Sequence, residues 1–341
     1  MAGSKPTIKD IAKICGVSIT TVSKVVNEKY SGIGQKTIER VTAAVKEHGY
    51  LPNAVARSMI TRKTLTIGLV LPDVRNPFFA ELARGVEDVA NERGYGCFLC
   101  NTDGNIEKED ACIALLRGRV ADGILFTTQN RVEFNPVFTR LWDDKYPFCL
   151  IERYLDGMPD APGVYFDNIG GARMATRHLL DNGHRNIAFI SGPETSVNAQ
   201  HRRQGYELAL REAGIEPDPA LAVGGDYRYS GGYKAMELLR ARKKLRYTAL
   251  FASNDLMALG AYQRLEEEGI RVPDDLSIVS FDNAPFPKVM KPAITTIELP
   301  AYAMGKSAAE MLFECLDGRA GVGARRVFEP KLIEKDSVRS L

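Results

Sequence analysis

The spacing of apolar residues along the chain changes near residue 65. Before that point apolar residues recur three and four positions apart, which is the period of an amphipathic helix. After it, short apolar runs alternate with helical patterns, which is typical of parallel sheets joined by right-handed helical crossovers. The sequence therefore predicts a small all-α head followed by a larger α/β body.

The head is predicted to hold two short helices and a third, longer one. Thr7 is a suitable N-cap for the first helix, which Gly16 ends. Ser18 can cap a second helix over 19–27, and a third amphipathic helix follows at about 36–48. Two short helices joined by a tight turn that contains glycine predict a helix-turn-helix, whose second helix enters the major groove of DNA.

The second helix leaves small hydroxyls and a cation on its outer face. The residues of this face are Ile19, Thr20, Thr21, Ser23, Lys24 and Asn27. Hydroxyl groups can hydrogen-bond base edges or phosphates, Ile19 can contact a thymine methyl group, and Lys24 can reach guanine acceptors. A helical domain that binds protein instead of DNA is the alternative.

Charge separates the two regions. Residues 1–64 contain eleven Lys and Arg against four Asp and Glu, a net charge of +7, whereas the whole chain carries only +2. The remainder is therefore acidic. This balance favours double-stranded DNA, a polyanion, as the partner of the head.

Residues 50–60 join the head to the body. Pro52 ends the preceding structure, and Asn53 can cap a helix that runs to residue 60. A helix of that length is too short to be stable alone, because an isolated helix needs roughly 12 to 15 residues. We expect it to form only when something packs against it, and we assign 1–49 to the head and 50–64 to a hinge helix and linker.

The body is predicted over residues 65–335 as two doubly wound parallel-sheet subdomains, crossed by more than one connection. The candidate strands are 65–71, 95–100, 122–126, 148–151 and 163–166, then 187–191, 220–224, 248–252 and 276–281, with helices such as 78–93, 169–182, 202–213 and 254–268. The first subdomain is expected at about 65–165 with a return segment at about 285–315. The second is expected at about 166–284 and about 316–335.

Ligands of open α/β sheets bind at the carboxyl ends of the strands, so the residues just past those ends are the candidate site. They are Phe78, Phe79, Asp103, Thr127, Arg153, Asp167, Asn198, Arg202, Tyr227, Asp255 and Asp282. Aromatic faces with carboxylates, an amide and arginines suit a small polyhydroxylated ligand. For Asp167 and Asp255 the alternative is a helix cap, and for the two phenylalanines it is the core.

Other functions find little support in the residues. Six cysteines form no disulfide framework, and Cys97 and Cys100 are expected on opposite faces of a strand, so neither metal nor cofactor is predicted. There is no GxSxG, HExxH or GxxxxGK[ST] motif, so no catalytic residues are assigned. Neither a membrane span nor a signal peptide is evident, and we expect a cytoplasmic protein.

Several short motifs lie along the chain. In the head and hinge they are Ile8-Lys9-Asp10-Ile11-Ala12, Gly16-Val17-Ser18, Thr21-Val22-Ser23, Asn27, Tyr50-x-Pro52-Asn53 and Ala56-Arg57-Ser58-Met59. In the body they include Asn76-Pro77-Phe78-Phe79-Ala80-Glu81, Asp122-Gly123-Ile124-Leu125, Gly183-His184-Arg185-Asn186-Ile187-Ala188 and Asn254-Asp255-x-Met257-Ala258. Together they resemble the lactose-repressor (LacI) family of bacterial transcription regulators, and the resemblance covers essentially the whole chain.

This resemblance implies a repressor that binds a two-fold operator as a homodimer, with a small effector, most often a sugar, in a cleft like that of periplasmic binding proteins. It adds Thr7, Ser18, Tyr50, Asn53, Ala56, Arg57 and Met59 to the DNA-binding residues, with Met59 in the place of a leucine that the family inserts between base pairs in the minor groove. A solute-binding protein or a sugar-processing enzyme with the same body is the alternative.

The chain also departs from the family pattern. Lys24 replaces the arginine that is usual in the family, and Gly34 lies where a serine N-cap is usual. Glu152 replaces an expected aspartate. No leucine heptad ends the sequence, so a dimer is favoured over a tetramer.

Overall fold

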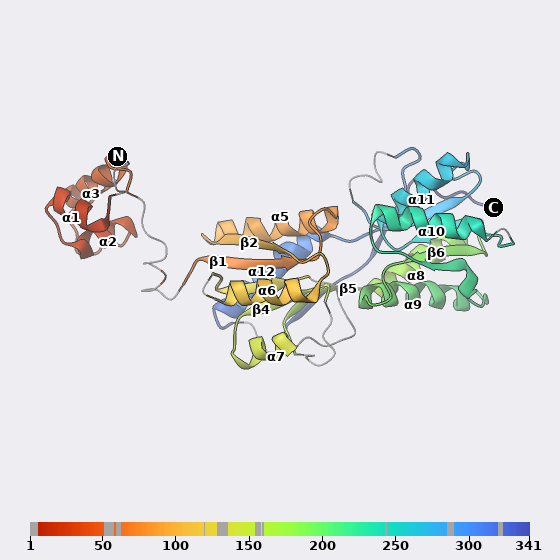
Figure 1. Cartoon of the computed structure of the whole chain (residues 1–341), viewed down its shortest axis with the longest axis horizontal. Helices are drawn as coiled ribbons and strands as arrows, with labels where there is room; N and C mark the ends of the chain where they lie inside the picture. Colours follow the sequence, from red (N-terminus) through yellow and green to blue (C-terminus); the bar gives the residue numbers. More distant parts are fainter. Residues whose placement is uncertain are drawn as a thin grey trace. The chain divides into compact units, whose positions relative to one another are not determined.

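The computed structural model describes residues 6–50, 58, 63–118, 120–127, 136–153, 158, 160–242, 244–284, 290–319 and 323–341. The chain divides into two compact units, residues 1–64 and 65–341, which correspond to the head and the body. Each unit is described by itself. Figure 1 labels their helices and strands.

The head contains three helices, α1 (Ile8–Cys15), α2 (Ile19–Val26) and α3 (Gln35–Glu47). The Thr7 hydroxyl accepts a hydrogen bond from Asp10 N, and the Asp10 carboxylate accepts one from Thr7 N, which completes a capping box at the start of α1. The Ser18 hydroxyl accepts from Thr21 N and caps α2. Gly34 precedes α3 without a side-chain cap, yet the helix begins one residue earlier than expected.

The first sheet of the body has six strands in the order β11-β5-β4-β3-β1-β2. The strands are β1 (Thr66–Leu71), β2 (Gly96–Asn101), β3 (Gly123–Phe126), β4 (Phe148–Ile151), β5 (Gly163–Phe166) and β11 (Arg325–Phe328), and every neighbouring pair is parallel. The helices of this subdomain are α5 (Pro77–Glu92), α6 (Ile106–Arg117), α7 (Pro136–Asp143) and α12 (Ala301–Leu316).

The second sheet also has six strands, in the order β12-β10-β9-β8-β6-β7. They are β6 (Ile187–Ser191), β7 (Ala222–Gly224), β8 (Ala249–Ala252), β9 (Ser277–Asp282), β10 (Thr295–Glu298) and β12 (Lys331–Ile333), of which only β12 pairs antiparallel among the described strands. Its helices are α8 (Asn168–Asp181), α9 (Val197–Glu212), α10 (Tyr229–Ala241) and α11 (Asp255–Glu267), with a short 3-10 helix at Pro219–Leu221.

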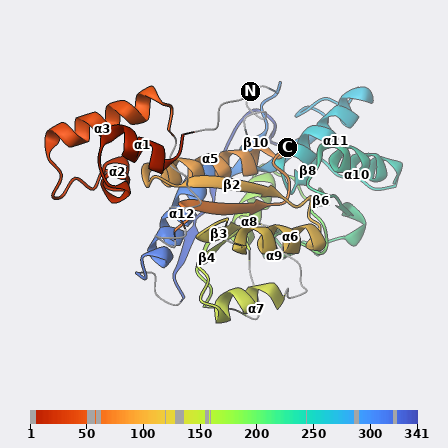
Figure 2. The ribbon, with the colours of Figure 1, turned by 60° about the vertical axis from the view of Figure 1, so that its left-hand side comes forward.

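Each sheet is covered on both faces by helices, as the two ribbon views show (Figures 1 and 2). Successive side chains along a strand therefore pack into apolar layers on opposite faces of the sheet. Leu69 and Leu71 of β1 pack in the cluster that includes α5 and α12 residues, whereas Val70 between them packs in the cluster that includes α6 and α7 residues. This burial on both faces explains why the strands are short and almost entirely apolar.

The chain passes between the sheets at three short connections: from β5 to α8, from β10 to α12 and from β11 to β12. Two parts of the predicted subdomain division are wrong. Strand β10 lies in the second sheet, although the return segment 285–315 was assigned to the first subdomain, and β11 lies in the first sheet, although 316–335 was assigned to the second. A local apolar pattern can reveal a strand, but it does not reveal which distant strand is its partner.

Candidate functional site

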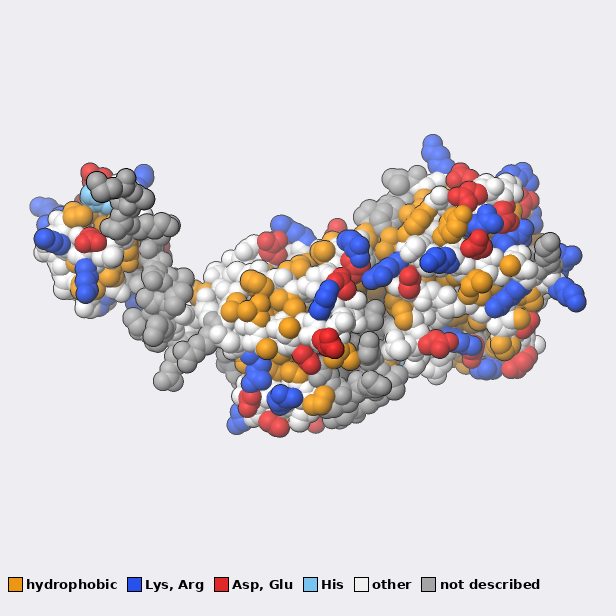
Figure 3. Space-filling view, in the orientation of Figure 1, with side chains coloured by type: hydrophobic (Ala, Val, Ile, Leu, Met, Phe, Trp, Pro, Cys, Tyr) orange, Lys and Arg blue, Asp and Glu red, His pale blue; other side chains and the backbone are white. Residues whose placement is uncertain are grey.

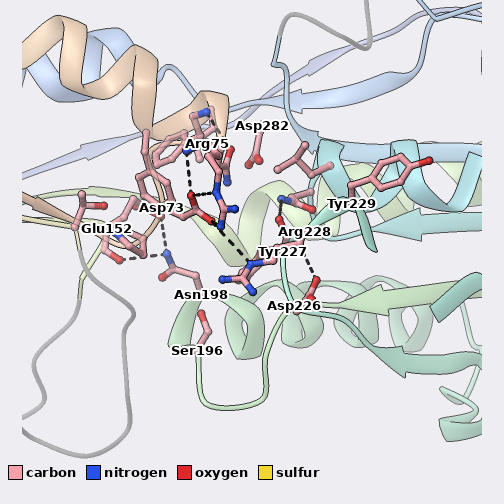
Figure 4. A pocket seen from close by; sticks show the side chains of 18 of the residues that line it. Asp73, Arg75, Glu152, Ser196, Asn198, Asp226, Tyr227, Arg228, Tyr229 and Asp282 are labelled. Atoms are coloured by element: carbon pink, nitrogen blue, oxygen red, sulfur yellow. Dashed lines mark hydrogen bonds and ion pairs between the residues drawn. The ribbon is translucent and has the colours of Figure 1, made fainter. Parts of the chain in front are cut away.

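A cavity of about 420 Å³ lies at the carboxyl ends of strands from both sheets. Eight of the eleven residues expected there line it: Phe78, Phe79, Asp103, Thr127, Asn198, Arg202, Tyr227 and Asp282. Figure 4 shows how side chains from both sheets converge on this pocket. Its volume lies within the range of small-molecule sites, about 300–1,000 Å³.

Four residues of the pocket have positive φ angles that side chains rarely adopt. Asp103, Glu152 and Tyr227 follow strands β2, β4 and β7, with φ of 52°, 53° and 62°. Asp282 is the last residue of β9 and has a φ of 110°. Such a backbone is strained for residues other than glycine, and it concentrates where a ligand site needs a defined side-chain direction. The positive φ angles of these four residues make the pocket a candidate functional site on grounds other than its shape.

Arg202 lies in the buried wall of the pocket and is only 5% exposed. Its Nε donates a hydrogen bond to Asn168 Oδ1 at 2.8 Å. Its Nη1 donates to the Ser253 carbonyl and also lies 3.6 Å from Asp282 Oδ1. The guanidinium also stacks over the Phe281 ring, 3.8 Å from its centroid. Burial raises the pKa of Asp282 well above its ordinary value, although Arg202 opposes this shift.

Glu152 brings a buried carboxyl group into the same wall. It accepts hydrogen bonds from Asn168 Nδ2 at 2.8 Å and Asn198 Nδ2 at 3.1 Å, both through Oε2. Neither Glu152 Oε1 nor Asn198 Oδ1 has a hydrogen-bond partner among the described residues. Burial raises the pKa of Glu152 to about 7. These unpaired acceptors favour a ligand that brings hydrogen-bond donors.

The mouth of the pocket is more exposed and more highly charged. Arg75 donates to Asp73 Oδ2 at 2.7 Å, and Arg228 Nε lies 3.9 Å from the same oxygen. The hydrogen bond from Arg75 lowers the pKa of Asp73. Asp103 pairs with Lys108 at 2.5 Å. The mouth therefore presents alternating charges around one central carboxylate.

Three of the expected residues do not line the pocket. Arg153 donates to the buried Glu109 Oε2 at 3.3 Å, and its guanidinium lies over the Phe138 ring. Asp167 caps α8 by accepting from Gly170 N at 2.8 Å, which was the alternative interpretation.

Asp255 was also wrong as a pocket residue. Its carboxylate accepts hydrogen bonds from Ser280, Thr296 and the backbone N of Ala284, so it ties α11 to strands β9 and β10. The preceding residue, Asn254, lines the pocket and caps α11. The prediction therefore missed by one residue.

Further lining residues were not predicted as contacts: Asp73, Arg75, Asn76, Glu152, Ser196, Asp226, Arg228, Tyr229, Ser230, Asn254, Leu256 and Leu299, together with Pro72. Several of them begin helices rather than follow strands. Ser196 caps α9, which starts at Val197 and not at residue 202 as expected, so Asn198 and Arg202 lie in the same helix. The N-cap residues Asn76, Ser196 and Asn254 were the sequence signal for this second group.

The head presents its predicted DNA-binding residues in different ways. Ile19, Thr20 and Lys24 are exposed on α2, and Thr20 and Lys24 make no side-chain hydrogen bond to other described residues. Thr7, Ser18, Thr21 and Asn27 already bond within the head, and Ser23 is half-buried. Tyr50 was wrong as a surface contact, because it packs in the head core and is 9% exposed. Asn53, Ala56, Arg57 and Met59 lie outside the described residues.

A helix-turn-helix head followed by a two-sheet body with a ligand-sized pocket defines a class of DNA-binding regulators that respond to small molecules. Residues 7–53 match the family model "Bacterial regulatory proteins, lacI family", and residues 176–338 match "Periplasmic binding protein-like domain". The chain belongs to the lacI family of bacterial regulatory proteins.

Relatives support this family over the full length. The chain is 37% identical over 338 residues to the HTH-type transcriptional repressor PurR of Aliivibrio fischeri, with 97% of this chain and 98% of that protein covered. It is similar to a transcriptional regulator CelR–cellobiose complex (33% identity, TM-score 0.74, coverage 97% and 99%). A lac repressor dimer bound to operator and an anti-inducer has the same fold (24% identity, TM-score 0.88, coverage 99% and 100%).

The part of the chain that the structure describes holds neither a membrane-spanning helix nor a cluster of metal ligands. None of its helices combines the length and the apolar character that crossing a membrane requires. Within the same residues, no three His, Cys, Asp or Glu side chains are grouped so that they could hold a metal ion.

Proposed function

We propose that this protein is a transcriptional repressor that binds a two-fold operator as a homodimer and changes its operator affinity when a neutral sugar occupies the pocket of the body. The observation that carries this proposal is the buried polar wall of the pocket, formed by Glu152, Asn198, Arg202 and Asp282. The same chain carries a basic helix-turn-helix head. The proposed switch links these two parts.

Operator recognition is assigned to the head. Its net positive charge supplies phosphate contacts that do not depend on sequence, and Ile19, Thr20 and Lys24 on α2 supply contacts to base edges. Lys24 lacks the planar fork of arginine, so its contact to guanine is less directional. Met59 is retained as the proposed apolar wedge of the hinge, in the residues that lie outside the described part.

The effector is assigned to the neutral polyhydroxylated class. Five carboxylates and three arginines line the pocket, so the pocket offers no excess positive charge to an anion. Asn198 Oδ1 is an unpaired acceptor, and Glu152 Oε1, also unpaired, accepts when the carboxyl group is ionised and donates when it is protonated. Hydroxyl groups both donate and accept, so they would satisfy these two atoms in either state. Phe78, Phe79 and Tyr227 add apolar ring surface against which the C–H face of a sugar can pack.

A homodimer is supported by an apolar surface of the first subdomain. Val74, Phe98, Leu99 and Leu115 are all 40–52% exposed, and they belong to strand β2, helix α6 and the segment after β1. Figure 3 shows hydrophobic side chains gathered around the place of β2 and α6 in Figure 1. An apolar patch of this kind is suited to burial against a second copy of the chain.

Catalysis is not part of the proposal, and the protein is assigned to the cytoplasm, where operator DNA lies. The relatives named above are transcription factors, which supports a binding function rather than turnover. The rivals are a solute-binding protein and a sugar-processing enzyme. Each would use the same pocket but would differ in DNA binding or in product formation.

The test begins with selection of operator sequences from random DNA by the full chain, followed by fluorescence anisotropy with and without a sugar panel. We expect a two-fold consensus, nanomolar binding at physiological salt and a shift of at least ten-fold with one sugar. No selected sequence would contradict the regulator assignment. Conversion of a sugar into a product would establish the enzyme.

A further inference from the structure

The pocket has two zones that differ in exposure. The inner zone contains Glu152, Arg202 and Asp282, none of which is more than 9% exposed. The mouth contains Arg75 and Arg228, whose side chains are 75% and 53% exposed. Both zones line one continuous cavity. A ligand held by the inner zone can therefore extend outward without leaving the pocket.

The cavity offers about 420 Å³, within the range of small-molecule sites, about 300–1,000 Å³. A ligand that filled only the inner zone would leave the space at the mouth to water. The inner zone already supplies the carboxylates, amide and guanidinium that one ring can use. The remaining space lies beside the charged side chains of the mouth.

Arg228 reaches across the pocket from the second sheet to the first. It directly precedes α10, and its Nε lies 3.9 Å from Asp73 Oδ2, which follows β1. The contact of Arg75 with the same carboxylate is shorter, at 2.7 Å. Figure 4 shows Asp73 between these two arginines. The Arg228 guanidinium makes no other ion pair or hydrogen bond within the described residues, so its donor fork remains open to a ligand.

The charges at the mouth balance. Asp73, Asp103 and Asp226 stand against Arg75, Lys108 and Arg228. A phosphate group on a single sugar would find no surplus positive charge there. A second neutral ring can instead accept from the guanidinium groups and donate to Asp73.

We propose that Asp73, Arg75 and Arg228 form an outer subsite for a second sugar unit, so that the effector is a neutral disaccharide or a glycoside of similar length. This inference rests on the proposed sugar-binding function and narrows its ligand class. The inner zone holds one ring. The outer subsite, whose residues come from both walls of the pocket, holds the second ring.

The test is calorimetric titration of the full chain with three matched sets of sugars. The sets are glucose, cellobiose and glucose 6-phosphate; galactose, lactose and galactose 6-phosphate; and fructose, sucrose and fructose 6-phosphate. In the set that binds, we expect the disaccharide to bind at least about ten-fold more tightly than its monosaccharide. A monosaccharide that binds equally well, or a phosphate that binds most tightly, would overturn the outer subsite while a sugar effector stands. No binding in any set would overturn the proposed effector class itself.

Substitution of Arg228 locates the effect. Arg228→Ala should weaken binding of the disaccharide about ten-fold and leave the affinity for the monosaccharide unchanged. The substitution keeps the hydrogen bond from the backbone N of residue 228 to Asp226, so the backbone before α10 should stay in place. Arg228→Lys should restore little of the disaccharide affinity, because lysine keeps the positive charge but lacks the planar pair of N–H donors of the guanidinium group. Full rescue by lysine would indicate an anionic ligand instead. The control is Arg203→Ala, which removes an exposed arginine paired to Glu207 outside the pocket. Equal weakening of both sugars by Arg228→Ala would overturn the subsite.

Discussion

The two units of the chain present their polar side chains in opposite ways. In the head, Thr20 and Lys24 project from α2 with no side-chain hydrogen bond to other described residues. In the body, Glu152, Arg202 and Asp282 are buried. Asn168 links Glu152 to Arg202, and Arg202 pairs directly with Asp282. Side chains that contact DNA can become ordered when the DNA binds. The polar side chains of a small-molecule pocket must already be held in place before the ligand binds. Substitution of the exposed Thr20 or Lys24 should therefore affect binding alone, whereas substitution of the buried pocket residues should affect binding and stability together.

The largest effect is expected for Arg202→Ala. The change removes a buried cation and leaves Asn168 Oδ1, the Ser253 carbonyl and Asp282 without it, which should lower the free energy of unfolding by about 3 kcal/mol. The effector response should be lost. Denaturant unfolding and operator binding with effector measure the two losses.

The neighbouring arginine is a matched control for that change. Arg203 lies in the same helix but is exposed, and among the described residues its ion pair is with Glu207. Arg203→Ala should therefore change stability by less than about 0.5 kcal/mol. If both substitutions lowered the free energy of unfolding equally, the contrast between buried and exposed polar groups would be wrong.

A second prediction concerns pH. Burial raises the pKa of Glu152 from its ordinary 4.5 to about 7 in the folded state. Between these values the folded chain holds a proton that the unfolded chain releases, so stability should fall as pH rises from about 5 to 7. Over this range the share of Glu152 amounts to about 2 kcal/mol. Asp255 and Asp282 shift in the same direction and add to the slope.

Glu152→Gln should reduce this pH dependence, because glutamine does not titrate. Urea unfolding of both proteins at pH 5, 6 and 7 gives the comparison. Glu216→Gln, at an 85% exposed side chain, is the control and should leave the slope unchanged. An identical slope for the Glu152 variant and the parent would mean that this carboxyl group is ionised throughout the range.

A smaller effect is expected in the head. Lys24→Ala should weaken operator binding about ten-fold, by roughly 1 to 1.5 kcal/mol, since one contact to a base or phosphate is lost. The melting temperature should not change, because Lys24 is exposed. Lys244→Ala removes the same charge from the body and should leave anisotropy titrations with operator DNA unaffected. A lower melting temperature for Lys24→Ala would show that head residues are also structural.

The smallest effect is expected at the start of α3. Gly34 occupies the N-cap without a side-chain hydrogen bond, and an added Cβ would meet no atom within 4 Å. Gly34→Ser should therefore stabilise the head by a few tenths of a kcal/mol. Thermal unfolding followed by circular dichroism measures it. Destabilisation would indicate that the glycine is needed for the backbone rather than tolerated.

The sequence was informative wherever the cause of structure is local. The strand of residues 66–71 is an apolar run, and Thr7 and Ser18 are caps whose hydrogen bonds span only three residues. It failed where the cause is distant. The partner of β10 in the sheet and the bonds of Asp255 to Thr296, forty-one residues away, leave no trace in a local pattern.

The pairing of β11 has a consequence for the order of folding. Arg325 of β11 lies beside Gly163 of β5, so the edge of the first sheet closes only across the long stretch of chain that forms the second sheet. The three helices of the head, by contrast, contact one another within residues 8–47. Contacts between neighbouring segments form faster than contacts between distant ones. We therefore expect a refolding chain to gain its DNA-reading surface before it gains the body that would pair it with a second copy.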